Sequence, residues 1–149
     1  MESVNFKIDL VGNGFEDRWP KCKVLVNGQL FYNNTVKESC TIDFDIELQE
    51  DSENKLIIEY YDKDYKKDVL LDDQGQVLQS TNILIKTVTM DDIDLGMVPY
   101  YNSIQDISDP WYTQSDLPNP REEDMQISWN GRWIMEFTSP VYIWLLENF

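Results

Sequence analysis

The sequence predicts an all-β protein, a jelly-roll-like β-sandwich with a long proline-rich loop, a C-terminal hairpin and a short terminal helix. Apolar and polar residues alternate along several short segments, which is the pattern of strands with one buried face. Two Asn-Gly dipeptides stand between such segments and favour type I′ turns. A length of 149 residues is enough for one domain with a substantial core.

The predicted sandwich covers residues 1–96. Residues 4–10 alternate strictly and form the first strand. Asn27-Gly28 joins two apolar runs in a hairpin, and residues 42–48 follow as a strand with acidic residues on its solvent face. Further strands are predicted at residues 55–61 and 83–88, separated by a polar stretch.

Residues 97–149 form a predicted arm, hairpin and helix that pack on the sandwich or on a partner. Residues 99–124 hold four prolines without periodicity, which predicts a long loop of the kind that is often functional. Asn130-Gly131 predicts a second hairpin. Ser139 as N-cap and Pro140 as first helical residue predict a short, strongly apolar helix.

Composition restricts the function. The chain has 12 basic and 28 acidic residues, a net charge of −16, which repels a phosphate backbone and argues against nucleic acid as a partner. A mimic of DNA is an alternative, but the regular alternation favours an ordinary sandwich. The chain has no histidine, which removes histidine-based acid-base and nucleophilic catalysis. A glycosidase with two carboxylates is the remaining enzymatic alternative. No sequence motif of a catalytic nucleophile is present, so we expect that the chain is not an enzyme.

The N-terminus lacks the basic and apolar regions of a secretory signal, and no apolar run approaches the roughly 18 residues of a membrane helix. We therefore expect synthesis in a cytoplasm and no membrane partner. Cys22 and Cys40 are too few for a disulfide framework or a cysteine-only zinc site, and we expect them to be reduced thiols on strands.

An acidic segment between two predicted strands is a candidate calcium site, because calcium prefers hard oxygen ligands. Its spacing is not that of an EF-hand, and a solvated charged loop is the alternative. A second acidic run, residues 91–94, has the same two interpretations. The candidate ligands are Asp62, Asp64, Asp68, Asp72 and Asp73.

Aromatic residues near this segment, in the proline-rich loop and at the C-terminus are candidate contacts for a sugar or a protein partner. Anchoring of loops to the core is the alternative. These candidates are Tyr65, Tyr100, Tyr101, Trp111, Tyr112, Trp144 and Phe149.

The first 96 residues resemble the calcium-dependent, xylan-binding carbohydrate modules. The resemblance lies in the Val24-Leu25-Val26-Asn27-Gly28 hairpin, the alternating strand after it, and the acidic loop leading to residues 82–88. It implies a jelly-roll fold, a calcium ion in the acidic loop and a polysaccharide ligand. The Asp-Arg pair that precedes the last strand in that family is Ser80-Thr81 here, and the acidic loop is longer.

The C-terminal segment, from residue 129 to residue 148, resembles the ends of virion proteins of tailed bacteriophages, which reuse such sandwiches as decoration, tail and baseplate parts. This implies a non-catalytic structural role with protein partners in a larger oligomeric assembly, after incorporation in the virion. A calcium-dependent carbohydrate-binding module is the alternative function.

Overall fold

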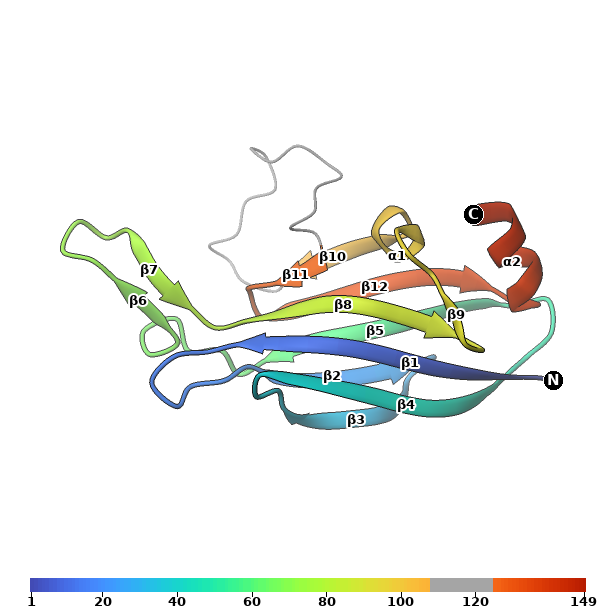
Figure 1. Ribbon diagram of the computed structural model, residues 1–149, viewed down its shortest axis with the longest axis horizontal. Helices are drawn as coiled ribbons and strands as arrows, with labels where there is room; N and C mark the ends of the chain where they lie inside the picture. The colour runs from blue at the N-terminus through green and yellow to red at the C-terminus, as the bar shows by residue number, and fades with distance from the viewer. Residues whose placement is uncertain (108–124) are drawn as a thin grey trace.

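The computed structural model describes residues 1–107 and 125–149. They form a sandwich of two antiparallel β-sheets, as the sequence predicted (Figure 1). The first sheet has the order β11-β8-β1-β4, and β9 also pairs with β8. Its strands are β1 (Glu2–Asn13), β4 (Ser39–Leu48), β8 (Asn82–Met90), β9 (Ile93–Asp94) and β11 (Gln126–Ile127).

The second sheet has the order β10-β12-β5-β2-β3 and lies behind the first in Figure 1. Its strands are β2 (Lys21–Val26), β3 (Gln29–Thr35), β5 (Glu53–Tyr61), β10 (Ser103–Ile107) and β12 (Gly131–Thr138). The β2–β3 connection is the predicted hairpin, and Asn27 and Gly28 both have the positive φ angles, 51° and 82°, of a type I′ turn.

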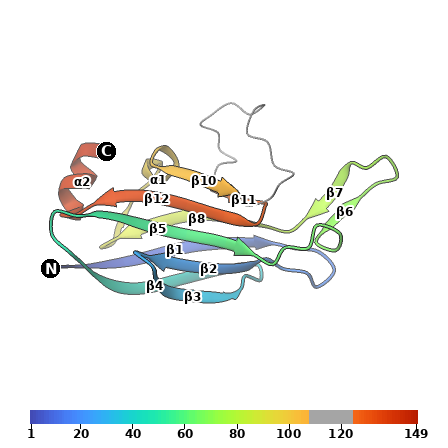
Figure 2. The ribbon, with the colours of Figure 1, turned by 180° about the vertical axis from the view of Figure 1, so that it is seen from behind.

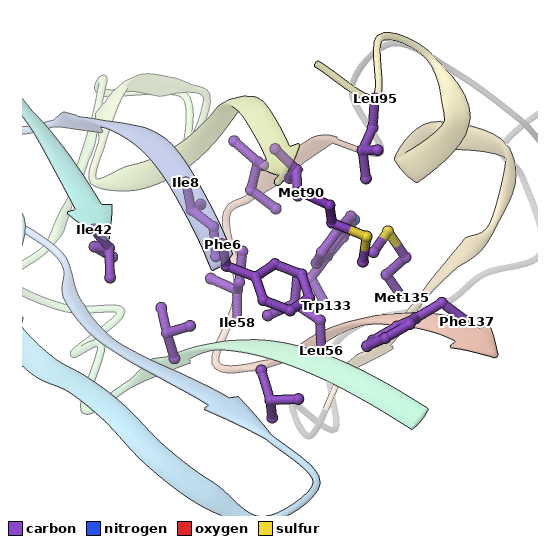
Figure 3. Close-up of a cluster of buried hydrophobic side chains, with 14 of the residues drawn as sticks. Phe6, Ile8, Ile42, Leu56, Ile58, Met90, Leu95, Trp133, Met135 and Phe137 are labelled. Carbon is purple, nitrogen blue, oxygen red and sulfur yellow. The ribbon is translucent and has the colours of Figure 1, made fainter. Parts of the chain in front are cut away.

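The core fills the space between the sheets. Alternate residues of β1 are at most 1% exposed, and they face alternate residues of β5 and β12 across the sandwich (Figure 3). Phe6 lies edge-on to Phe137, with ring centroids 5.8 Å apart. Each large apolar side chain buried in this way contributes about 1.5–3 kcal/mol, so the period-two alternation is the main source of stability.

The two ends of the sandwich differ. Both termini lie at one end, where α2 (Val141–Asn148) covers the core through Trp144 (Figure 1). At the other end, the small hairpin of β6 (Val69–Leu71) and β7 (Val77–Ser80) projects beyond the sheets. This hairpin lies in the stretch that the sequence predicted to be a loop. None of the described helices has the length and apolar character needed to cross a membrane.

The predicted C-terminal hairpin does not form. The segments around Asn130-Gly131 do not pair with each other, because β11 joins the first sheet and β12 the second. A side chain at Gly131 would lie 2.6 Å from the Asp106 carbonyl oxygen, so this glycine permits close pairing of β12 with β10. The sandwich therefore extends beyond residue 96.

The described start of the predicted proline-rich loop is also ordered. Residues 98–101 form α1 (Val98–Tyr101), and β10 follows it at the edge of the second sheet. Residues 108–124 of that loop lie outside the described residues.

Helix α2 begins one residue later than predicted. Pro140, not Ser139, is its N-cap. The Ser139 hydroxyl instead donates to the Gln49 carbonyl oxygen, while the Glu2 carboxylate accepts a 2.9 Å hydrogen bond from the Val141 amide. A carboxylate at this position satisfies a free amide of the first turn and complements the helix dipole.

Both cysteines are free thiols, and Cys22 is fully buried. Burial raises the pKa of the Cys22 thiol well above its usual range. Above roughly pH 8.5 the unfolded chain therefore loses this proton while the folded chain keeps it, so the free energy of unfolding falls as the pH rises.

We expect Cys22→Ala to reduce this pH dependence. The wild type should lose up to about 1.4 kcal/mol per pH unit more than the variant between roughly pH 9 and 10. Urea denaturation across that range measures the difference in slope. Cys40→Ala, at a half-buried position, should have a smaller effect, and equal slopes for wild type and Cys22→Ala would contradict the assignment.

Candidate functional site

A polar pocket opens at the end of the sandwich that carries the β6–β7 hairpin. Three segments meet there: the β1–β2 loop, the end of β3 and the segment after β5. Figure 2 shows these connections close together beside the hairpin. The pocket is lined by Asp17, Arg18, Trp19, Lys21, Thr35, Lys37, Tyr60, Asp62, Asp64, Lys67 and Asp68.

The β1–β2 loop presents Trp19 to this pocket. Phe15 and Arg18 exchange backbone hydrogen bonds of 3.1 and 2.9 Å, which close a short turn. Gly14 lies against the indole, since a side chain there would come within 2.7 Å of the ring. Trp19 is thus held by its own loop while remaining partly exposed to solvent, as a residue must be to contact a ligand.

The charges in the pocket are balanced, although the whole chain carries −16. Four of the lining side chains are cationic and four are anionic. Arg18 and Asp68 form an ion pair at 3.3 Å, and Lys21 approaches Asp62 at 3.9 Å. A pocket of this kind offers donors and acceptors together without a strong net field, and it suits a neutral ligand rich in hydroxyl groups.

Lys63 is buried behind the pocket and joins its segments. Its ammonium group donates to the Ser80 hydroxyl and to the carbonyl oxygens of Thr81 and Ser128, at 2.7, 2.7 and 2.5 Å. The Asn130 side chain bonds both the amide and the carbonyl of Lys63. Burial lowers the pKa of Lys63 to about 8, so at neutral pH the ammonium is protonated and its three donors match three acceptors.

We expect Lys63→Met to destabilise the fold by about 2–4 kcal/mol, because it leaves buried oxygen acceptors without donors. Chemical denaturation measures the change. Lys66→Met, at an exposed position on the same segment, is the matched control and should change stability by less than about 0.5 kcal/mol. Equal effects of the two variants would contradict a structural role for the buried ammonium.

Four of the predicted calcium ligands, Asp62, Asp64, Asp68 and Asp72, make hydrogen bonds or ion pairs within the chain. Asp68 accepts from Arg18 and from the Asp64 amide, and Asp64 accepts from the Lys66 amide. Asp72 accepts two backbone amides, 2.8 Å each, in the β6–β7 turn, where Asp73 also lies. Within residues 1–107 and 125–149, no three acidic or thiol side chains come close enough to hold a metal.

The second acidic run is also engaged in structure. Asp91 accepts the Asn5 amide at 2.8 Å, Asp92 pairs with Lys7 at 3.1 Å, and Asp94 accepts the Gly96 amide. These carboxylates fix the turn after β8 and its contact with β1.

The predicted aromatic contacts are dispersed. Tyr65 packs against Trp129, and its hydroxyl accepts from the Asn130 amide, so it anchors a loop. Tyr100 is nearly buried, whereas Tyr101 beside it is 69% exposed. The pocket brings together three of the predicted acids, but none of these aromatics. Trp111 and Tyr112 lie outside the described residues.

The two C-terminal aromatics have different environments. Trp144 packs on Phe137 and is 5% exposed, at the border of a second hollow near α2. Phe149 is 67% exposed at the end of the chain.

Sequence reasoning missed the other residues that line the pocket, among them Trp19, Arg18 and Lys67. An aromatic residue between a turn-rich segment and Pro20 was the available signal for Trp19. Arg18 gave no signal, because only the fold brings the β1–β2 loop beside the segment after β5, whereas Lys67 lies in that segment itself, next to Asp68 in the sequence.

No protein-family model matches the chain, and no curated protein matches it. Among solved structures, it is similar to a carbohydrate-binding module, vCBM60, in complex with galactobiose. The TM-score is 0.50 at 8% identity, and the match covers 88% of this chain and 96% of that one. The SeMet form of vCBM60, described in a study of calcium-dependent carbohydrate-binding modules, gives a TM-score of 0.48 at 10% identity, covering 89% of each chain. The chain thus has a carbohydrate-binding-module-like fold, which confirms the resemblance seen in the sequence.

Proposed function

We propose that this chain is a non-catalytic carbohydrate-binding module that binds a neutral sugar in the polar pocket around Trp19. The observation that carries the proposal is the balance of four cationic and four anionic side chains around one partly exposed indole. The similarity of the fold to a carbohydrate-binding module supports it.

The pocket supplies the two interactions that a sugar requires. The apolar face of a pyranose ring packs on an aromatic ring, and its hydroxyl groups both donate and accept hydrogen bonds. Trp19 offers the ring, Asp62 and Asp64 accept, and Lys21 and Lys67 donate. Charged partners strengthen these hydrogen bonds relative to neutral ones.

Calorimetric titration with galactobiose and with a xylo-oligosaccharide tests the proposal. We expect binding by the wild type, and Trp19→Ala should weaken it at least about tenfold, equivalent to about 1.4 kcal/mol. Tyr142→Ala removes an exposed aromatic ring from α2, far from the pocket, and is the matched control. Binding that Trp19→Ala leaves unchanged would contradict the site, and no binding of any glycan across a broad panel would contradict the function.

The same titration distinguishes calcium dependence. Because the aspartates are engaged by backbone amides and cations, we expect sugar binding to persist in excess EDTA. Asp62→Asn combined with Asp68→Asn tests the predicted calcium ligands directly. Micromolar calcium binding that this double variant abolishes would restore the calcium-dependent module as the correct interpretation.

Assembly into a larger particle, such as the predicted decoration, tail or baseplate of a phage virion, is the second candidate. The exposed apolar residues of α2 favour it, since Leu146 and Phe149 are 75% and 67% exposed. If the chain has this role, it should co-sediment with assembled particles. Leu146→Ser combined with Phe149→Ser should abolish this, whereas unchanged co-sedimentation would count against it.

A further inference from the structure

A row of aliphatic side chains crosses the outer face of the second sheet. The β-pairing places Ile104 opposite Ile134, Ile134 opposite Ile57, Ile57 opposite Leu25, and Leu25 opposite Leu30. Opposed residues of antiparallel strands share a face, so one apolar residue from each of the five strands lies in this row. Ile104 and Leu30, at the two ends, are 61% and 50% exposed.

Charged residues flank the row on both sides. They lie two residues before and two residues after the apolar residue of the same strand, and therefore about 7 Å from it. On one side lie Arg132 of β12 and Glu59 of β5. On the other side lie Glu136 of β12 and Lys55 of β5. β12 and β5 thus each carry opposite charges on opposite sides of their apolar residue.

We propose that this face binds the same face of a second copy of the chain, with the two-fold axis running along the aliphatic row. Rotation about that axis exchanges the two flanks, so Arg132 faces Glu136 of the partner subunit and Glu59 faces Lys55 of the partner subunit. Symmetry doubles this to four opposite-charge pairs around a continuous apolar seam. The strands of the two sheets then run nearly antiparallel, which matches aligned packing of sheets.

The shape of the face agrees with this geometry. A hollow beside the row is lined by Glu53, Lys55, Ile57 and Glu136. It lies on the flank that the partner's Arg132 meets, and its two glutamates suit a guanidinium group. The Arg132 side chain is 55% exposed, and its Nε donates to Glu59 of the same chain at 2.9 Å, so the contact with the partner's hollow falls to the Nη groups.

The charges on β5 disfavour a face-to-face dimer whose two-fold axis runs parallel to the strands. An axis parallel to the strands would place Glu59 against Glu59 of the partner subunit and Lys55 against Lys55 of the partner subunit. Like charges in direct opposition are unfavourable. The face is also near neutral overall, in contrast to the acidic outer face of the first sheet with Asp43, Asp45 and Glu47.

The expected affinity is modest. Five strands at roughly 4.8 Å spacing and eight residues at roughly 3.4 Å rise give a footprint of about 600 Å² per subunit. This is at the small end of stable interfaces, so association should depend on concentration in the micromolar range or above.

Sedimentation velocity of the full chain, from micromolar to millimolar concentration at about 0.15 M salt, tests the proposal. We expect a dimer that Ile104→Ser combined with Leu30→Ser weakens at least tenfold. Leu146→Ser changes an apolar residue of α2 that is even more exposed, at 75%; it is the control and should leave the dimer intact. A monomer at every concentration would overturn the proposal, as would a dimer that only Leu146→Ser disrupts.

A mixing experiment tests the axis itself. Lys55→Glu alone and Glu59→Lys alone each place like charges across the interface, so each variant should be monomeric. When the two variants are mixed, the carboxylate introduced at position 55 of one faces the ammonium introduced at position 59 of the other. The unchanged Glu59 of the first variant likewise faces the unchanged Lys55 of the second, and we expect a heterodimer.

Circular dichroism of each charge variant confirms that it is folded. Two folded variants that do not associate when mixed, although the wild type dimerises, would rule out this axis.

Discussion

Every other feature of this protein depends on the packing of two sheets through alternate residues of their strands. Because side chains point to opposite faces in turn, one set of residues forms the core around Phe6 and Trp133 and the other set forms two independent outer surfaces. The outer surface of the first sheet is acidic, whereas that of the second carries the aliphatic row. The same constraint leaves the loops at the strand ends free to build a polar site, as is usual for rigid scaffolds.

The buried Lys63 ammonium connects that scaffold to its polar end. It joins the segment after β5 to the residues before β8 and to those after β11, and thereby fixes one wall of the pocket. The Lys63 ammonium does not itself line the pocket. It holds in place the segment that carries Asp62, Asp64 and Asp68.

Much of the fold could be predicted from local patterns. The alternation of β1, β4 and β5 and the Asn27-Gly28 turn depend on neighbouring residues only, and the sequence identified them. The pairing of β11 and β12 with different sheets could not be predicted. The Asn130-Gly131 dipeptide has the sequence of a type I′ turn, but its residues make tertiary contacts instead, Asn130 with Lys63 and Gly131 with Asp106. Acidic residues pointed to the end of the sandwich at which the pocket opens. Their partners Arg18 and Lys21 come from a distant segment, so the ion pairs could not be predicted.

We propose that the pocket around Trp19 is the sugar-binding site of this carbohydrate-binding-module-like sandwich. The most direct test is an NMR titration of the isotope-labelled chain with galactobiose and a xylo-oligosaccharide in the presence of EDTA, following every backbone amide. We expect the shifted amides to cluster in residues 14–21 and 60–68. Shifts confined to the outer face of the second sheet or to α2, or no shifts with either sugar at saturating concentration, would contradict it.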